Sequence, residues 1–238
     1  MATHTRADLE SLLRTRKLDG TLTTAHPWRA APAGDAVATG LDALDARLGG
    51  GVPRGHLSSL AGPPSSGRTS VLVRLLGAVA AGGELTALVD TRDTFDPASA
   101  AASGLDVSRL LWIRGGPVTS ADSRQATLER QLDRAVKALT LVLQAGGFGL
   151  VALDVADVPD PLVRALPFTT WLRLARSVEG SRTACLIVGA RAVARSPGGV
   201  TIALEAGGAA SWSGASDRAR VFGGLSIQPR VVQARRAG

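Results

Sequence analysis

The sequence predicts an α/β fold, with a mostly parallel sheet, helices on both of its faces and an antiparallel extension at the C-terminal end. Short continuous apolar runs recur along the chain, and such runs are typical of parallel strands that are covered on both faces. Helical patterns lie between these runs, as the crossovers of a parallel sheet require. After Gly199 the helical patterns stop, and the strand-like pieces 200–204 and 225–232 predict the antiparallel extension.

The individual elements follow from the same patterns. A leucine stripe predicts an amphipathic helix over 5–18, and Gly82-Gly83 and Gly146-Gly147 end two further helices, at 69–81 and 128–145. The apolar runs predict strands at 57–61, 86–90, 110–113, 148–153 and 184–188. We therefore divide the chain into an N-terminal helix and linker (1–38), a nucleotide-binding core (39–205) and a basic C-terminal extension (206–238).

The charge is concentrated at one end of the chain. The 238 residues contain 27 basic and 20 acidic side chains, but residues 31–190 are balanced, whereas 191–238 hold seven arginines against two acids. A basic end attracts nucleic acid or an acidic partner. A solvated arginine-rich tail is the alternative, and the general preference for arginine over lysine also reflects genome composition.

Composition also excludes several classes of protein. An apolar fraction of 45% is too high for an intrinsically disordered chain, and no apolar run is long enough for a membrane span. The charged N-terminus argues against a secretion signal, and the single cysteine, Cys185, is expected in the core. We expect a cytoplasmic protein. The three histidines lack metal-ligand spacing, so no metal site built from protein ligands alone is expected.

The segment 57–70 is the most informative one, because it has the strand, loop and helix order of a phosphate-binding loop. Gly62 and Gly67 have the spacing G-x-x-x-x-G, which lets backbone amides surround phosphate oxygens. The following helix adds its positive N-terminus. An inert glycine turn is the alternative. Arg68 replaces the usual lysine of the loop, and Thr69 is placed to bind Mg²⁺. The predicted cofactors are ATP and Mg²⁺, and the predicted cofactor-binding residues of this segment are Gly62, Ser65, Ser66, Gly67, Arg68, Thr69 and Ser70.

An acidic residue ends the buried run 148–154. An acid at the carboxyl end of a parallel strand faces the ligand crevice, where it can hold magnesium. Asp154 therefore reads as a Walker B acid, and Arg68 and Asp154 are the leading catalytic candidates.

Three motifs resemble the RecA-type ATPases: Thr39–Asp45, Leu48–Gly55 and Gly62–Gly67. The resemblance covers roughly 38–205 and implies a RecA-like core. The segment 227–236 is similar to the arginine-rich end of the ImuA branch, whose members assist mutagenic translesion synthesis.

The resemblance also exposes departures at the catalytic positions. The family's water-orienting glutamate corresponds to Arg92, and its sensor glutamine falls near Ala190. Loss of these groups slows phosphoryl transfer strongly. Asp90 or Asp93 could partly substitute for the glutamate, so weak DNA-dependent ATP hydrolysis stays open. Asp96 matches the acid that meets the adenine edge.

The resemblance further implies two DNA-binding loops, at 158–168 and 191–199. The candidate DNA contacts in these loops and at the basic end are Arg164, Arg191, Arg195, Arg230, Arg235 and Arg236. Phe168 and Trp171 lie near the first loop, and we expect them in the core rather than stacked on bases.

Three functions are compatible with these observations. The first is a RecA-like accessory protein in SOS-induced mutagenic translesion synthesis and DNA repair. Its partners would be DNA, RecA, a Y-family-like polymerase partner of the ImuB type and an error-prone replicative-type polymerase. The second is a DNA-stimulated ATPase or recombination mediator with RadA/RecA-like activity. The third is a non-catalytic assembly component that docks on a neighbour, or on another copy in a homo-oligomer, through residues 5–18.

Overall fold

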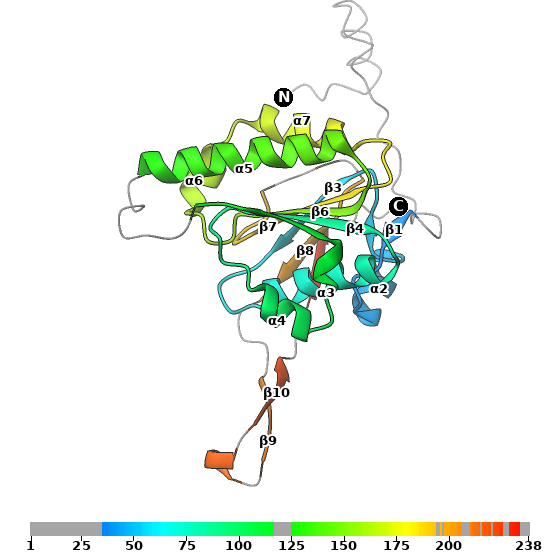
Figure 1. The fold of residues 1–238 in the computed structure, drawn as a ribbon, viewed down its shortest axis with the longest axis vertical. Helices are drawn as coiled ribbons and strands as arrows, with labels where there is room; N and C mark the ends of the chain where they lie inside the picture. The colour runs from blue at the N-terminus through cyan, green and yellow to red at the C-terminus, as the bar shows by residue number, and fades with distance from the viewer. Residues whose placement is uncertain are drawn as a thin grey trace, which may run out of the picture.

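A seven-stranded sheet forms the centre of the computed structural model (Figure 1). The structure describes residues 35–116, 125–193, 196, 198–205, 210–214, 216–219, 221–225 and 229–233. The strand order is β11-β8-β3-β7-β6-β4-β5. The strands of this sheet are β3 (Leu57–Ala61), β4 (Leu85–Asp90), β5 (Leu110–Arg114), β6 (Phe148–Asp154), β7 (Ala184–Gly189), β8 (Thr201–Leu204) and β11 (Pro229–Gln233).

Helices cover both faces of the sheet, as the sequence predicts. On one face, helix α3 packs its apolar side against alternate residues of the strands, such as Leu60, Leu88 and Leu150. On the other face, α5, α6 and α7 pack against the intervening residues, such as Val89 and Val151 (Figure 1). The helices are α2 (Asp42–Leu48), α3 (Arg68–Ala81), α4 (Pro97–Ala102), α5 (Gln125–Ala145), α6 (Asp160–Ala165) and α7 (Phe168–Val178), with short 3₁₀ turns η2 (Val107–Arg109) and η4 (Asp217–Ala219).

The parallel register brings the carboxyl ends of the central strands to one edge. Ala61 pairs with Gly189, and Asp90 pairs with Asp154. The last residues of β3, β4, β6 and β7 therefore lie along a single edge, where the ligand crevice of an open α/β sheet forms. This arrangement positions the loop after β3 near the acid that ends β6.

The C-terminal part of the sheet differs in one respect from the expectation. The predicted fold class is confirmed, but β8 pairs parallel with β3, and the antiparallel direction begins only with β11. The pattern of apolar residues reports that a segment is a strand, but it does not report the strand's direction. The strand β11 comes from the predicted extension and pairs with the last strand of the predicted core.

Two smaller pairs of strands complete the described structure. The strands β1 (Ala36–Val37) and β2 (Val52–Pro53) pair antiparallel beside α2, and β9 (Ala210–Ser213) and β10 (Val221–Leu225) form a hairpin away from the sheet (Figure 1). None of the described helices is long and apolar enough to cross a bilayer. The predicted helix at 5–18 lies outside the described residues.

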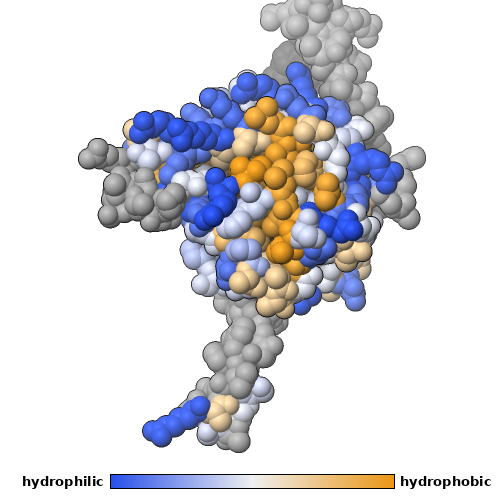
Figure 2. Space-filling model, viewed as in Figure 1, coloured by the Kyte–Doolittle hydropathy of each residue, from blue (hydrophilic) through white to orange (hydrophobic). Residues whose placement is uncertain are grey.

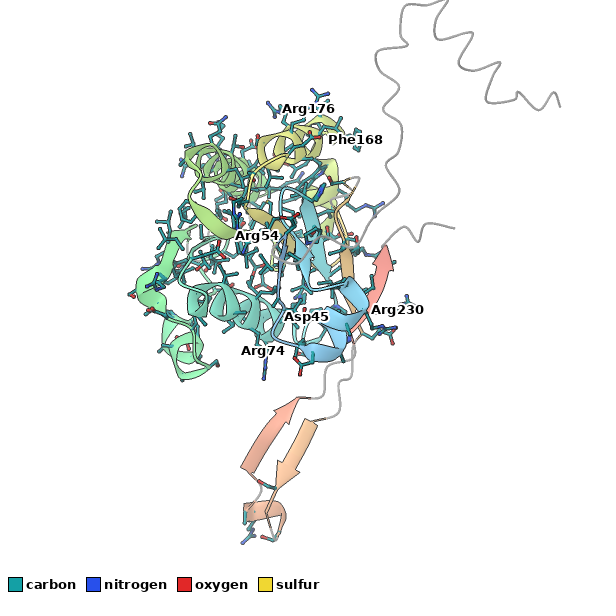
Figure 3. The ribbon with its side chains drawn as sticks, turned by 90° about the vertical axis from the view of Figure 1, so that its right-hand side faces the viewer. Asp45, Arg54, Arg74, Phe168, Arg176 and Arg230 are labelled. Atoms are coloured by element: carbon teal, nitrogen blue, oxygen red, sulfur yellow. The ribbon has the colours of Figure 1, made fainter. Side chains whose placement is uncertain are left out.

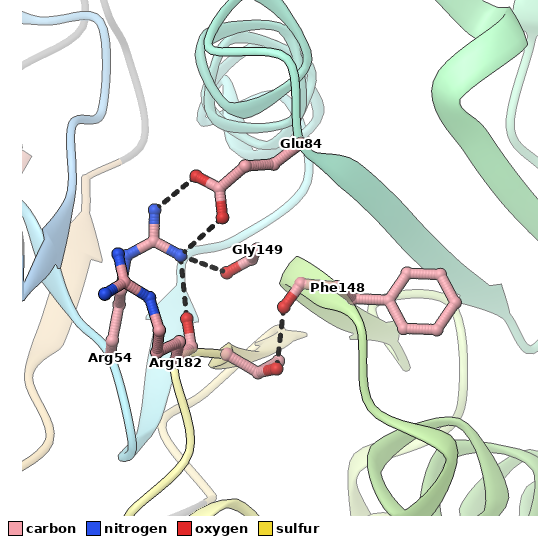
Figure 4. Close-up of polar contacts among 6 residues, drawn as sticks. Arg54, Glu84, Phe148, Gly149 and Arg182 are labelled. Carbon is pink, nitrogen blue, oxygen red and sulfur yellow. Dashed lines mark hydrogen bonds and ion pairs between the residues drawn. The ribbon is translucent and has the colours of Figure 1, made fainter.

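An arginine joins several strands at their amino ends (Figure 4). The Arg54 guanidinium donates to both carboxylate oxygens of Glu84, just before β4, and forms an ion pair with it. It also donates to the carbonyl oxygens of Gly149, at 3.4 Å, and Arg182, at 2.7 Å. The Arg54 side chain thus links the starts of β4, β6 and β7 at the edge opposite the candidate site.

Candidate nucleotide and DNA-binding site

The loop between β3 and α3 has the backbone shape of an anion-binding turn. Ser65 and Gly67 adopt left-handed conformations, with φ of 59° and 88°. Gly67 is the N-cap of α3, and no side chain caps the first turn of the helix. The first amides of a helix have no intrahelical acceptor, so uncapped they are available to an anion. This geometry agrees with the glycine spacing in the sequence.

Two polar side chains of this loop are buried without a hydrogen-bond partner. Arg68 is 8% exposed and its Nη1 has no acceptor, and the Oγ of Ser66 is equally unpaired. A buried polar atom without a partner costs about 1–3 kcal/mol, so such atoms call for a ligand or another explanation. Phosphate oxygens would accept from both groups. By contrast, Ser65, Thr69 and Ser70 are exposed at the mouth of the loop, where Thr69 can reach a metal ion.

Gly62 leaves no space for a side chain. A Cβ at this position would lie 2.4 Å from the Oγ of Ser66 and 3.0 Å from the Cβ of Leu204. The Gly62 amide donates to the carbonyl oxygen of Gly189, at 3.2 Å. The first glycine of the motif is therefore required by close packing of the loop against β7 and β8.

Asp154 lies where the sequence places it, at the end of β6. Burial raises the pKa of Asp154 to about 6, against a hydrogen bond from the Ala156 amide that lowers it, and the neighbouring Asp90 raises it further. The positive charge of Arg68 acts on the same carboxyl group and lowers its pKa. The two leading catalytic candidates, Arg68 and Asp154, therefore lie close enough to interact electrostatically.

The two acids that could replace the missing glutamate are both engaged elsewhere. Asp90 is 2% exposed and accepts hydrogen bonds from the amides of Thr94 and Phe95 and from the indole of Trp112. Asp93 forms a two-point ion pair with Arg114, which holds the pKa of Asp93 below its usual value. Each acid would have to give up these partners before it could orient a water molecule.

Arg92, which corresponds to the glutamate in the sequence resemblance, lies in the turn after β4 and points toward α5. The Nη1 of Arg92 donates to the Oε1 of Gln131 on α5, at 2.8 Å. Asp96 caps α4 by accepting from the Ala98 amide and the Ser99 hydroxyl, and the Ser99 hydrogen bond holds the pKa of Asp96 below its usual value. Ala190 follows β7 and offers no polar group at the sensor position.

Two of the candidate DNA contacts meet although they come from different loops. Arg164 and Arg191 both reach the carboxylate of Asp160, at 3.8 and 3.6 Å, and both side chains are largely exposed. Arg230 lies on β11, and Figure 3 shows it away from Arg176 and Phe168 on α7. Arg195, Arg235 and Arg236 lie outside the described residues.

The environments of the two aromatic residues differ from each other. Trp171 is 6% exposed and packs in the core, as expected. Phe168 is 66% exposed on the outer side of α7, so the expectation that it belongs to the core is wrong (Figure 3). It begins the helix, and residues of a first turn can lie beyond the packed stripe. Cys185 is fully buried in β7, where burial raises the pKa of its thiol to about 12.

The sequence analysis missed two residues of this region. Thr91 donates its amide to the carbonyl oxygen of Asp154, and its buried Oγ1 has no partner. The only available signal was its position directly after an apolar strand. Asp160, which pairs with both arginines, could have been found from its spacing of four residues before Arg164 on a helix.

Comparison with known proteins agrees with this geometry. The family model for the RecA N-terminal domain matches residues 29–136. Protein RecA of Nostoc punctiforme is 36% identical over 95 residues, which are 40% of this chain and 25% of that protein. Protein RecA of Chlorobium chlorochromatii is 42% identical over 77 residues (32% and 22%), and that of Arthrospira platensis 36% over 104 residues (43% and 27%). The chain spans about a quarter of the length of these relatives, and the comparisons support a RecA-like family for it.

Proposed function

We propose that this chain is a RecA-like accessory protein in SOS-induced mutagenic translesion synthesis and DNA repair, which binds ATP with Mg²⁺ and contacts DNA. The observation that carries the nucleotide part is the pair of buried, unpartnered donors in the loop, Ser66 Oγ and Arg68 Nη1. Both belong to a loop whose backbone already has the shape for an anion. ATP phosphates would supply the missing acceptors.

The loop after β3 and the acid that ends β6 would bind different parts of the nucleotide–metal complex. The amides at the start of α3 and the guanidinium of Arg68 would bind the phosphate oxygens, since arginine forms two-point contacts with phosphate. The Thr69 hydroxyl and the Asp154 carboxylate would hold Mg²⁺, which neutralises phosphate charge. A bound cation also favours the ionised form of Asp154, whose pKa is raised in its absence.

We expect binding to be accompanied by slow hydrolysis or none. Arg92 stands where the family has its water-orienting acid, and its guanidinium is bonded to Gln131. Asp90 and Asp93 are held by other donors. The loop thus keeps donors for phosphate, whereas the two acids expected to replace the water-orienting glutamate are both engaged by other groups.

Calorimetry with ATP and Mg²⁺ tests the nucleotide site. We expect binding to the purified chain, and at least about tenfold weaker binding by Arg68→Ala, because a charge-assisted phosphate contact is lost. Arg68→Lys should retain most of the affinity. Arg74→Ala is the matched control, because Arg74 lies on the exposed side of the same helix and, among the described residues, donates only to the Gly40 carbonyl oxygen. Absence of binding at millimolar ATP would show that the loop is an inert turn.

Phosphate release, measured with and without single-stranded DNA, separates the accessory protein from the second candidate. DNA-stimulated release that disappears in Arg68→Ala and Asp154→Ala would favour a DNA-stimulated ATPase or recombination mediator with RadA/RecA-like activity. Release that persists in both variants would come from a contaminant. No release from a chain that binds ATP supports the accessory role.

The partners in translesion synthesis are proposed from the resemblance of the C-terminal end and from its basic charge. Co-purification with RecA, with an ImuB-type polymerase partner and with an error-prone replicative-type polymerase at modest salt tests them. Association with none of the three, and none with DNA, would refute the accessory role.

An exposed apolar surface favours self-association as an additional property. Leu85, Leu111 and Leu141 are all exposed, and Leu85 and Leu111 project from the sheet on the α5 side, because Leu111 pairs with Ala87 of the α5-side core. Leu111 lies on the edge strand β5 and Leu85 begins the neighbouring strand β4, and Figure 2 shows a band of apolar side chains on the face seen in Figure 1. We propose that the leucine stripe of residues 5–18 of a second copy covers this surface.

Sedimentation velocity tests this interface. Deletion of residues 1–20 and, separately, Leu111→Asp should each convert an oligomer to a monomer. Leu172→Asp is the control, because Leu172 is exposed on α7, away from β5. A full-length chain that sediments as a monomer at high concentration would refute the interface.

A further inference from the structure

A second cleft lies on the α5 side of the sheet, across the sheet from the helix that follows the phosphate loop. It has a volume of about 520 Å³ and opens between the carboxyl ends of β4 and β5 and the first turns of α5. Val89, Ile113 and Ala135 are apolar residues of its lining, which we call its floor. The lining also includes Arg114, Arg130 and Arg134. Val89 and Ile113 pack with α5, whereas α3 packs on the opposite face, so this cleft is separate from the phosphate loop.

Within the part of the chain that the structure describes, two arginines of this cleft have no acidic partner. Arg130 donates only to groups of its own helix, the Ala126 carbonyl oxygen at 3.1 Å and the Thr127 hydroxyl at 3.4 Å. Arg134 lies one turn further along α5, and within the described residues it forms no hydrogen bond or ion pair. Residues four apart on a helix lie on the same face, so the two guanidinium groups flank the same opening.

The acids near the cleft offset only part of its positive charge. Asp93 is paired with Arg114, whose guanidinium also lies over the ring of Trp112, 4.6 Å from its centre. Asp90 lines the cleft, but its carboxylate accepts three hydrogen bonds from the chain. These donors are uncharged, so Asp90 keeps its negative charge, and the three lining arginines against Asp90 and Asp93 leave the described part of the cleft with a net positive charge.

The walls of the cleft are fixed by close packing. A Cβ on Gly115 would lie 2.0 Å from the carbonyl oxygen of Thr91, and one on Gly116 would lie 2.4 Å from the Nε2 of Gln131. The Gln131 amide oxygen accepts from Arg92, which leaves the NH₂ group of Gln131 as the donor beside Gly116. Arg92, at the position of the family's catalytic acid, thus supports this second cleft.

We propose that this cleft binds a nucleotide monophosphate unit, with the phosphate on Arg130 and Arg134 and the base on the apolar floor. Arginine binds phosphate through two parallel hydrogen bonds, and a cleft of this volume is within the range that holds a small ligand. The combination of a cationic rim and an apolar floor fits a ligand with one anionic and one flat apolar end. The unit is either a free mononucleotide or the terminal nucleotide of a DNA strand with a 5′-phosphate.

Calorimetry with AMP and with a 5′-phosphorylated oligonucleotide, each on the full chain, tests the proposal. All titrations are made on the Arg68→Ala background, so that the phosphate loop does not contribute. We expect binding on this background, and at least about tenfold weaker binding after the further changes Arg130→Ala and Arg134→Ala. Both arginines are exposed, and among the described residues neither bonds to a group outside α5, so the fold should survive. Lys137→Ala, also exposed on α5, is the matched control.

The outcomes separate the two sources of the nucleotide. Comparable affinity for AMP and the oligonucleotide indicates a free mononucleotide. Binding of the 5′-phosphorylated oligonucleotide alone, with no binding of the unphosphorylated one, indicates a strand end. No binding of either probe on the Arg68→Ala background, or binding that is unchanged by Arg130→Ala with Arg134→Ala, would overturn the proposal. These results are independent of whether the phosphate loop binds ATP.

Discussion

At the scale of single residues, the buried carboxyl group of Asp154 predicts a pH dependence of stability. Its pKa is about 6 in the folded chain and close to 4 when unfolded, so between these values the folded state holds a proton that the unfolded state has lost. The free energy of unfolding therefore falls as pH rises from about 4 to about 6 and then levels off. Above pH 6 the accumulated loss is about 3 kcal/mol, from about two pKa units at roughly 1.4 kcal/mol each.

Asp154→Asn removes this loss while keeping an acceptor for the Ala156 amide. Without nucleotide or Mg²⁺, the variant should be more stable than the original chain by about 3 kcal/mol at pH 7.5, and the difference should vanish below pH 4. Urea unfolding followed by circular dichroism at several pH values measures it. Asp133→Asn, an exposed change on α5, serves as the control. A stability difference that does not vary with pH would contradict the assignment.

Two glycines, one before helix α3 and one inside it, predict alanine substitutions with opposite effects on stability. Gly62→Ala would place a Cβ against Ser66 and Leu204, and such overpacking costs about 1–3 kcal/mol. Gly77 lies inside α3, where a Cβ would meet nothing closer than 3.9 Å. Gly77→Ala should therefore stabilise the chain by about 0.5–1 kcal/mol, the usual difference between these residues in a helix.

Thermal unfolding of the two variants checks this pair. Gly62→Ala should also weaken ATP binding, because Ser66 must move, whereas Gly77→Ala should leave it unchanged. Equal stability of the two variants would mean that the loop after β3 relaxes around the added methyl group.

At the scale of the elements, the sequence predicted the central strands and helices well, because their apolar periodicity is set by burial on two faces. Arg68–Ala81 and Phe148–Asp154 match the expected segments within a residue. Long-range features were not predictable. The direction of β8 depends on which strand it pairs with, and the helix α6 inside the expected DNA loop 158–168 depends on packing of Val163 in the α5-side core.

In the candidate site, too, the local motifs were predictable from the sequence but the long-range contacts were not. The loop and Asp154 follow from local spacing, and the structure places them together. The engagement of Asp90 by Trp112 could not be foreseen, because this contact joins neighbouring strands. The turn of Arg92 toward Gln131 depends in the same way on the placement of α5.

Because Arg54 bonds to groups at the amino ends of several strands, its removal should lower the free energy of unfolding. The Arg54 side chain is 11% exposed but Glu84 is 40% exposed, so part of the charge interaction is screened by solvent. We expect Arg54→Met to lower the free energy of unfolding by about 2 kcal/mol, below the 3–5 kcal/mol of a fully buried pair. Two carbonyl oxygens also lose their donor.

Chemical unfolding of Arg54→Met, Glu84→Gln and the double variant measures the coupling, which should be about 1 kcal/mol. Arg47→Met is the control, since Arg47 is exposed and, within the described parts of the chain, donates only to the Pro229 carbonyl oxygen. Additive effects of the two changes would show that the pair acts independently.

At the scale of the whole molecule, the distribution of charge predicts how DNA binding depends on salt. Arg164 and Arg191 come from separate segments but share Asp160, so each arginine divides its attraction between the carboxylate and any phosphate nearby. On single-stranded DNA each phosphate contact contributes about 0.7 to the slope of log K against log salt concentration. Arg164→Ala with Arg191→Ala should therefore weaken binding to single-stranded DNA and reduce the slope by about 1.4, at roughly 0.7 for each arginine.

For Asp160→Asn the same geometry predicts the opposite change in DNA affinity. Removing the carboxylate frees both arginines for phosphate, so DNA binding should tighten and the slope should not fall. Arg74→Ala is the control, because Arg74 lies on the exposed side of α3. Fluorescence anisotropy with a labelled oligonucleotide between 50 and about 200 mM salt measures all four chains. If Asp160→Asn weakens binding, the two arginines do not face DNA, and the basic C-terminal end alone must account for any affinity.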